Sequence, residues 1–216
     1  MSPAEFEERF GFPISQAVRF PPSYNIGPYR DVPVIFADRD NRPRMRMMQW
    51  QLVPSFAKAR KSKFAMFNTR DDSFDKKPFW RRMLQQSRCI FPMNNFFEWK
   101  KATGQKIPYL FELADHSLIS AGGIFSIWHD ETGEKFYSAS VITVDANAVV
   151  ADIHPRMPFI LPPGAEKDWL NRDHTEFATL RKLIAPFPAE KMHGKRVSHR
   201  INNIRNDDET LIEASE

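Results

Sequence analysis

The chain contains little of the chemistry that marks secreted and membrane proteins. It has one cysteine, Cys89, among 216 residues, which excludes an intrachain disulfide and fits a reducing compartment. No apolar run approaches the roughly 20 residues that span a bilayer, and the acidic N-terminus does not resemble a signal peptide. We therefore expect a cytoplasmic protein with no membrane partner.

Several catalytic motifs are also missing. Glycine is scarce, with eight residues against seventeen prolines, and Gly122-Gly123 lacks the downstream Lys-Ser/Thr of a phosphate-binding loop. No Gly-x-Ser-x-Gly elbow is present. The six histidines are scattered, with no His-Glu-x-x-His helix, and no cysteine pair exists for zinc. These absences predict no small-molecule cofactor and no metal.

Basic charge, in contrast, is concentrated in one stretch. The formal net charge is +4, and residues 39–63 contain eight basic side chains against Asp40 alone. They are Arg39, Arg42, Arg44, Arg46, Lys58, Arg60, Lys61 and Lys63. Two interpretations compete, a solvated basic face and a groove that binds nucleic acid.

The spacing of apolar and turn-forming residues predicts hairpins with helices between them. A capping box at Ser2, Pro3 and Glu5 begins a helix that ends at Gly11. The other expected elements are strands at 32–37, 44–52, 89–92, 96–101, 108–113, 118–128, 135–144 and 195–198, and helices near 78–87, 146–152, 165–171 and 174–185. Because repeated βαβ units are absent, we predict an α+β fold. We expect a mixed, largely antiparallel sheet with a barrel-like core and peripheral helices, in a single domain over 1–216.

The residues around Glu98 indicate acid/base chemistry. Glu98 stands between Phe97 and Trp99, and large aromatic neighbours remove water from a carboxylate. Loss of water raises the carboxyl pKa toward neutrality, which suits proton transfer. The alternative is a strand glutamate beside aromatic side chains that cover the core.

Other polar residues lie at the ends of apolar segments, and each is ordinary when taken singly. With their neighbours they form a series of short segments. In chain order the segments are Tyr24-Asn25-Ile26-Gly27-Pro28, Trp50-Gln51-Leu52-Val53-Pro54, Asn68-Thr69-Arg70, Arg88-Cys89-Ile90-Phe91-Pro92, Phe96-Phe97-Glu98-Trp99-Lys100, Thr143, Ile153-His154-Pro155-Arg156-Met157-Pro158, Val197-Ser198 and Asn203-Ile204-Arg205-Asn206. In this order and spacing, over about residues 20–206, they resemble the SOS-response-associated peptidase (SRAP) family.

The resemblance implies a DNA-damage protein that binds single-stranded DNA and captures abasic sites covalently. The family's nucleophile is a cysteine at the N-terminus after removal of Met. Its α-amine forms a Schiff base with the abasic aldehyde, and its thiol then closes a thiazolidine ring. The same centre is credited with autoproteolytic release of the residues ahead of the cysteine. Such a protein would be cytoplasmic and would join the nucleoid when DNA is damaged.

The resemblance also assigns roles to individual residues. Glu98 would be the general acid/base, His154 would act on the sugar hydroxyl or leaving group and assist reversal, and Asn68 would orient the terminal amine. Residues expected to contact DNA are Asn25, Trp50, Lys58, Lys61, Arg70, Thr143 and Arg156. Among these, Arg70 would hold a phosphate by a forked contact, and Trp50 would stack against bases.

The chain departs from the family at its start. The family begins Met-Cys-Gly-Arg, whereas this chain begins at the first helix with Ser2-Pro3. Cys89 lies in an expected strand and has no α-amine, so it cannot substitute. We expect a truncation rather than a natural loss of capture, because Asn68, Glu98 and His154 are retained. As printed, the chain should bind DNA but crosslink poorly or not at all.

Two other functions remain open. One is a non-catalytic nucleic-acid-binding module that has lost the crosslinking nucleophile. The other is a peptidase that acts on other proteins, which is disfavoured because no nucleophile with a paired base is present. Oligomeric state is not determined by the sequence.

Overall fold

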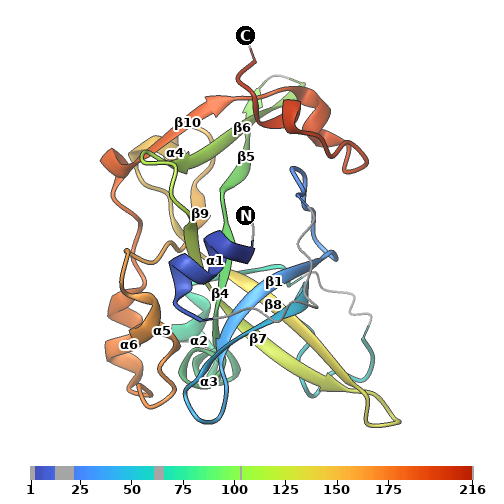
Figure 1. Ribbon diagram of the computed structural model, residues 1–216, viewed down its shortest axis with the longest axis vertical. Helices are drawn as coiled ribbons and strands as arrows, with labels where there is room; N and C mark the ends of the chain where they lie inside the picture. The colour runs from blue at the N-terminus through green and yellow to red at the C-terminus, as the bar shows by residue number, and fades with distance from the viewer. Residues whose placement is uncertain (1–2, 13–21, 61–65, 103, 216) are drawn as a thin grey trace.

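The computed structural model describes residues 3–12, 22–60, 66–102 and 104–215 (Figure 1). The expected first helix is α1, Pro3–Phe10, and it ends at Gly11, whose φ of 71° is the left-handed conformation that glycine tolerates. Phe6 of this helix is fully buried, and Arg9 forms an ion pair of 2.5 Å with Glu166. The expected cap Ser2 lies outside the described residues.

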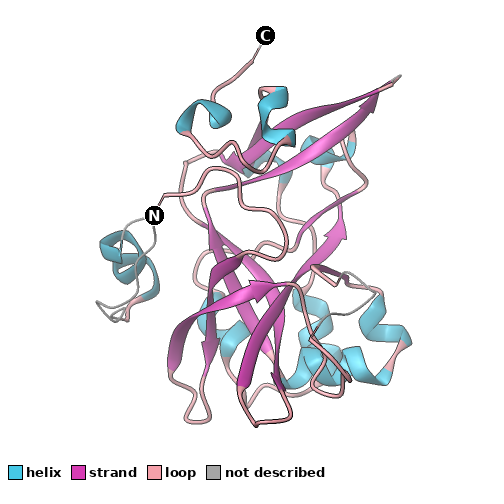
Figure 2. Ribbon diagram, turned by 90° about the vertical axis from the view of Figure 1, so that its right-hand side faces the viewer, coloured by secondary structure: helices cyan, strands magenta, loops and turns pink. Residues whose placement is uncertain are grey.

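A seven-stranded sheet forms the larger part of the molecule, in the order β2-β1-β4-β7-β8-β3 with β9 beside β8. Its strands are β1 Asp31–Ala37, β2 Pro43–Trp50, β3 Asn68–Arg70, β4 Arg88–Met93, β7 Ile119–His129, β8 Lys135–Asp145 and β9 Arg156–Pro158. A parallel pairing of β2 with β8 closes the first five strands of this order into a barrel (Figure 2). The predicted α+β fold with a mixed sheet and a barrel-like core is therefore confirmed.

The two adjacent glycines serve the packing of this barrel. A Cβ atom added at Gly122 would lie 2.4 Å from the Phe159 ring, and one added at Gly123 would lie 2.5 Å from the Phe91 ring. Distances below 3.0 Å are not found for real Cβ atoms. Gly122 and Gly123 therefore make room for aromatic side chains of the core, which agrees with the absence of a phosphate-binding loop.

A separate three-stranded sheet, β10-β6-β5, stands above the barrel in Figure 1. It consists of β5 Asn95–Ala102, β6 Gln105–Leu113 and β10 Met192–Arg196. Alternation along β5 divides its side chains between two faces. Phe97 and Trp99 pack with Leu110, and with the short 3-10 helices η2 His199–Asn202 and η3 Glu209–Ile212. Glu98 is thereby directed to the opposite face.

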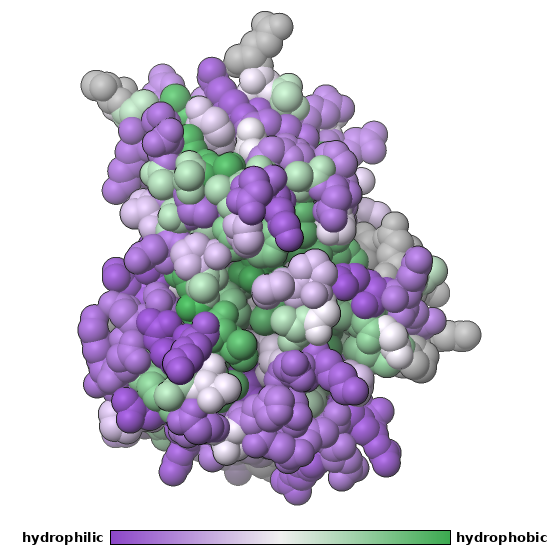
Figure 3. Space-filling view, turned by 90° about the vertical axis from the view of Figure 1, so that its left-hand side faces the viewer, coloured by the Kyte–Doolittle hydropathy of each residue, from purple (hydrophilic) through white to green (hydrophobic). Residues whose placement is uncertain are grey.

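The helices are short. They are α2 Ser73–Lys76, α3 Pro78–Gln86, α4 Ala148–Ala151, α5 Glu166–Leu170, α6 Phe177–Leu183 and the 3-10 helix η1 Ala189–Lys191. Of these, α2, α3, α5 and α6 lie around the barrel, whereas α4 and η1 lie beside β10. Figure 3 shows apolar side chains gathered across the middle of the face that carries α5 and α6, with hydrophilic surface above and below. No helix in the described part of the chain is long and apolar enough to cross a membrane.

Some element boundaries differ from those predicted. The last strand is Met192–Arg196 rather than 195–198, and the three-residue strands β3 and β9 were not expected as strands. Segments this short carry too few residues for a periodic pattern, so only pairing with β8 makes them strands. The 3-10 helices also lack a distinct sequence signal.

Candidate active site

Glu98 is held in a partly dehydrated position on β5. The strand pairs Glu98 with Tyr109 of β6, and the Glu98 side chain is 21% exposed. Burial raises the pKa of Glu98 to about 7, against opposing contributions from His154 and the Trp99 backbone amide. A carboxyl group with this pKa is present in both protonation states near neutral pH, as a general acid/base requires.

His154 faces this carboxylate. Its Nδ1 lies 3.6 Å from Glu98 Oε2, and the same nitrogen lies 2.9 Å from the carbonyl oxygen and 3.2 Å from the amide nitrogen of Arg156. A protonated Nδ1 donates to the carbonyl, whereas an unprotonated Nδ1 accepts from the amide. Nε2 makes no hydrogen bond within the described residues, so it is the ring nitrogen open to a substrate. Thus the backbone of Arg156 fixes the His154 ring in either protonation state.

The Arg156 side chain is anchored in turn by an ion-pair network. Its Nη2 lies 2.5 Å from Asp71 Oδ1 and its Nη1 lies 2.5 Å from Asp145 Oδ1, and it also donates to the Thr143 carbonyl. Asp71 Oδ2 accepts from Arg181 of α6 at 3.0 Å. The predicted contact of Arg156 with DNA would require one of these pairs to open. The pair with Asp145 is the accessible one, since Asp145 is 87% exposed and Asp71 only 17%.

β3 presents Asn68 and Arg70 on one side. This strand runs parallel to β8, with Asn68 opposite Val141 and Arg70 opposite Thr143. Thr69 points inward, where its hydroxyl bonds that of Ser140 at 2.8 Å, so Asn68 and Arg70 share the exposed side. The Arg70 side chain is 63% exposed and pairs with Asp72 at 3.2 Å.

Contacts connect these residues at one end of β8. Asp71, next to Arg70, donates its amide to the Thr143 carbonyl at 3.0 Å and holds Arg156, which positions His154 beside Glu98. The structure therefore brings together five of the predicted site residues: Glu98, His154, Arg156, Arg70 and Thr143. Thr143 is buried, and its backbone oxygen makes these contacts.

Trp50 lies beside this group at the end of β2. Its indole Nε1 donates to the Phe67 carbonyl at 2.9 Å, one residue before Asn68. The ring is half-buried, and its centroid lies 6.3 Å from that of Phe67. This position leaves part of the indole free to stack against a base.

Asn25 belongs to a different part of the molecule. Its Nδ2 lies within 3.0–3.2 Å of the carbonyl oxygens of Ile201, Asn203 and Asn206. The backbone amides of Tyr24 and Asn25 both donate to Asp207. Because these bonds occupy its amide group, Asn25 fixes the C-terminal segment, and the structure does not bring it together with Glu98.

Some basic side chains of residues 39–63 make contacts within the protein, so only part of this stretch is available to DNA. Lys58 is exposed in the loop after β2, and Lys61 lies outside the described residues. Arg46 and Arg60 stack over Tyr137 and Phe136, each 3.8 Å from the ring centroid.

Cys89 is fully buried in β4, and burial raises the pKa of its thiol well above the ordinary value. A buried, protonated thiol is a poor nucleophile. Cys89 is therefore a core residue, in the strand where the sequence placed it.

Comparisons with known proteins identify the family of the chain. A sequence model of the family described as SOS response associated peptidase (SRAP) matches residues 1–204. The chain is 35% identical over 194 residues to the abasic site processing protein YoqW of Bacillus subtilis, covering 89% of this chain and 86% of YoqW. It is 33% identical over 220 residues to the abasic site processing protein HMCES of Gallus gallus, covering 88% of this chain and 65% of HMCES.

Among solved structures, the fold is similar to a crystal structure of a protein from Bacteroides thetaiotaomicron. The TM-score is 0.76 with 28% sequence identity, over 87% of this chain and 82% of the other.

Proposed function

The chain belongs to the SRAP family, and we propose from this membership that it binds single-stranded DNA and captures abasic sites covalently. A role with abasic sites in DNA damage is supported by the names of its relatives. The strand state of the DNA, the capture chemistry and an associated autopeptidase activity are our inference. We also propose that the protein works in the cytoplasm and at the nucleoid when DNA is damaged.

One observation carries the proposal, namely the 3.6 Å contact between Glu98 and His154. A dehydrated carboxyl group with a pKa of about 7 and an imidazole form an acid/base pair suited to an aldehyde substrate. An abasic site reacts in its open-chain form, so ring opening needs one group to remove the O1 proton and another to protonate the ring oxygen. Glu98 and His154 can divide these two steps.

The same pair serves the later proton transfers. Attack of an α-amine on the aldehyde carbon forms a carbinolamine, and loss of water from it gives the Schiff base. Protonated Glu98 donates to the leaving hydroxyl group. The thiol then adds to the C=N carbon and transfers its proton to nitrogen, which closes the thiazolidine without any net oxidation.

The nucleophile in this proposal is a terminal cysteine, because only that residue offers both an α-amine and a thiol. Cys89 does not fill this role, since it is buried and its nitrogen is part of a peptide bond. The test therefore compares the printed chain with a version extended by Met-Cys-Gly-Arg and a short strand.

The experiment is a denaturing gel after incubation with single-stranded DNA that carries one abasic site. We expect a heat-stable shifted band with the extended protein and none with the printed chain. An extended protein with Ser in place of the added Cys is the matched control and should not shift. If the extended protein gives no band while it still binds the DNA, the capture chemistry is wrong and a binding module remains.

The proposed DNA contact of Arg70 has its own test. Arg70→Ala should weaken single-stranded DNA binding and reduce the slope of log affinity against log salt by about 0.7, as expected for one lost phosphate contact. Asp72→Asn should leave binding unchanged or stronger, because Asp72 now pairs with Arg70. Unchanged affinity and slope in Arg70→Ala would contradict the assigned groove.

A further inference from the structure

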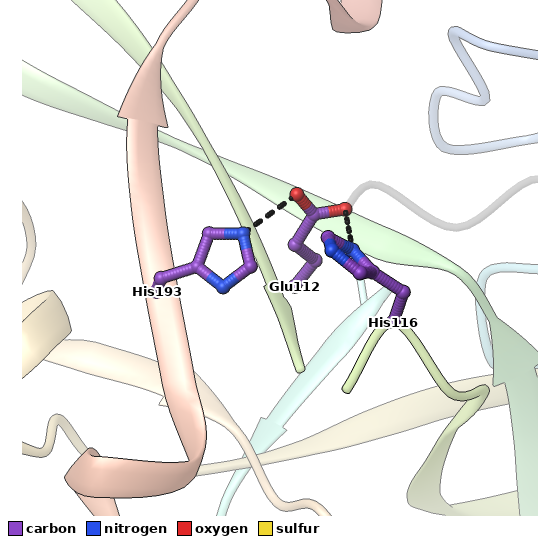
Figure 4. Close-up of side chains that lie close together, drawn as sticks. All are labelled: Glu112, His116 and His193. Carbon is purple, nitrogen blue, oxygen red and sulfur yellow. Dashed lines mark hydrogen bonds and ion pairs between the residues drawn. The ribbon is translucent and has the colours of Figure 1, made fainter. Parts of the chain in front are cut away.

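A second group of histidine and glutamate side chains lies on the three-stranded sheet, away from Glu98. Glu112 of β6 stands opposite His193 of β10, and His116 lies in the turn after β6. Glu112 Oε1 lies 2.8 Å from His193 Nε2, and Glu112 Oε2 lies 3.6 Å from His116 Nδ1 (Figure 4). The three side chains converge from two strands and a turn.

The local backbone fixes this convergence. The antiparallel register places Glu112 and His193 on the same face of the sheet. His116 has a φ of 56°, and its amide donates to the Leu113 carbonyl at 2.9 Å. This tight turn directs the imidazole back over the strand, so its ring meets that of His193 at a centroid distance of 5.4 Å.

The charges favour an ionised carboxylate. Partial burial raises the pKa of Glu112, but the hydrogen bond from His193 and the charges of Lys195, His193 and His116 outweigh it, and the pKa is held below its ordinary value. Lys195 Nζ lies 3.5 Å from Glu112 Oε1. Glu112 is therefore an anion with two imidazole nitrogens and one ammonium group beside it.

We propose that Glu112, His116 and His193 bind a zinc ion. One ligand atom from each residue lies within 4.8 Å of the other two. Neighbouring ligands of tetrahedral zinc lie about 3.3 Å apart, given bonds of about 2.0–2.2 Å. The separations of 2.8 Å from Glu112 Oε1 to His193 Nε2 and 3.6 Å from Glu112 Oε2 to His116 Nδ1 fall on either side of that value. The His116 side chain, 71% exposed, is free to make the remaining adjustment.

Two imidazoles and one carboxylate form a borderline donor set that suits zinc better than the oxygen-binding cations calcium or magnesium. Water would be the fourth ligand. Zinc would replace the hydrogen bond between His193 and Glu112, because an imidazole binds metal through an unprotonated nitrogen. The sequence predicted no metal, since Glu112 and His193 are far apart in the chain and only the β6–β10 pairing joins them.

The site is separate from the proposed capture chemistry. Asn95 of β5 pairs with Glu112, and Glu98 lies three residues further along that strand, about 10 Å away at about 3.3 Å per residue. The odd separation also places Glu98 on the opposite face. Zinc would therefore join β6, β10 and the turn after β6 without occupying the DNA site.

The test is isothermal titration of zinc chloride into the purified 216-residue chain after treatment with a chelator. We expect one zinc per chain and an increase in Tm on binding, since an ion that binds only the folded state stabilises it. His193→Gln, His116→Asn and Glu112→Gln should each weaken binding by at least about tenfold, because each removes one of three ligands. Asn suits the left-handed conformation at residue 116.

Two control variants separate a built site from scattered surface histidines. His129→Gln changes an exposed histidine of β7 and should leave zinc affinity unchanged. Lys195→Met removes the competing charge beside Glu112 and should tighten binding by about three- to tenfold. The proposal is overturned if the chain binds no zinc at 1:1 stoichiometry, or if the three ligand variants, shown folded by their metal-free Tm, bind as tightly as the parent chain.

Discussion

The hairpin of β5 and β6 carries two glutamates, Glu98 and Glu112, each beside histidine. Their environments shift the carboxyl pKa in opposite directions. Glu98 meets one imidazole at 3.6 Å, and burial raises the Glu98 pKa to about 7. Glu112 accepts a hydrogen bond from His193 at 2.8 Å and lies near Lys195 and His116, and its pKa is lowered. The same residue types therefore give a proton carrier at one position and a fixed anion at the other.

The difference shows that the hydrogen bond from His193, together with the charges of Lys195, His193 and His116, outweighs the effect of burial on the Glu112 pKa. At Glu98 burial dominates, because the one nearby imidazole does not approach within hydrogen-bond distance of the carboxylate. Acid/base catalysis uses the first environment and metal binding uses the second. Four variants test this comparison.

The largest expected effect concerns abasic-site capture by the Cys-extended protein. Glu98→Gln should slow capture on the order of a hundredfold, the low end for loss of a general acid/base. Glu112→Gln, on the same hairpin, should leave the rate unchanged. Rates come from gel quantification over a time course, and equal rates in the two variants would remove the distinction between the glutamates.

Folding stability should reveal the raised pKa of Glu98. The folded carboxyl keeps its proton up to about pH 7, whereas the unfolded one loses it near 4.5. The contribution of this group to folding stability is fully present below pH 4.5 and is lost as the pH rises to 7. Glu98→Gln should therefore raise the free energy of unfolding by about 3 kcal/mol at pH 8 and leave it unchanged below pH 4.5, as measured by urea titration. The opposite sign at pH 8 would refute the dehydrated carboxyl.

Asp71 tests whether the position of His154 depends on the ion-pair network. Asp71→Asn removes the charge that holds Arg156 and Arg181, and we expect capture to slow about tenfold, as for displaced catalytic groups. The pH profile of the rate should also move, because His154 is bound to the Arg156 backbone. Asp75→Asn, which loses only a contact with Arg181, is the control. A lower rate with an unmoved pH profile would indicate a structural role only.

The smallest expected effect is the stability of Glu112→Gln. A carboxyl with a lowered pKa contributes stability above its unfolded value of 4.5, and this contribution is lost as the pH falls. At pH 8, without metal, the variant should lose about 0.5–1 kcal/mol, as is usual for an exposed charge pair. A gain in stability, as expected for Glu98→Gln, would show that the two environments do not differ.

Much of the candidate site could be predicted from sequence because its motifs are local. Glu98 stands between two aromatic residues, and Asn68-Thr69-Arg70 forms a strand whose alternation places both polar side chains outward. The roles of Asn25 and Arg156 could not be predicted in the same way. Their functional groups are occupied by partners distant in the chain, namely carbonyls of residues 201–206 and Asp71.

From the sequence alone came the α+β hairpin pattern, the position of Cys89 in a strand and the family, because periodicity and short motifs depend on neighbouring residues. Tertiary structure alone decided the closure of the barrel through β2 and β8, the pairing of Glu98 with His154 and the meeting of Glu112 with His193. The reason is physical. Burial and charge at a carboxylate depend on which distant strands approach it, and strand pairing over long separations has no local signal.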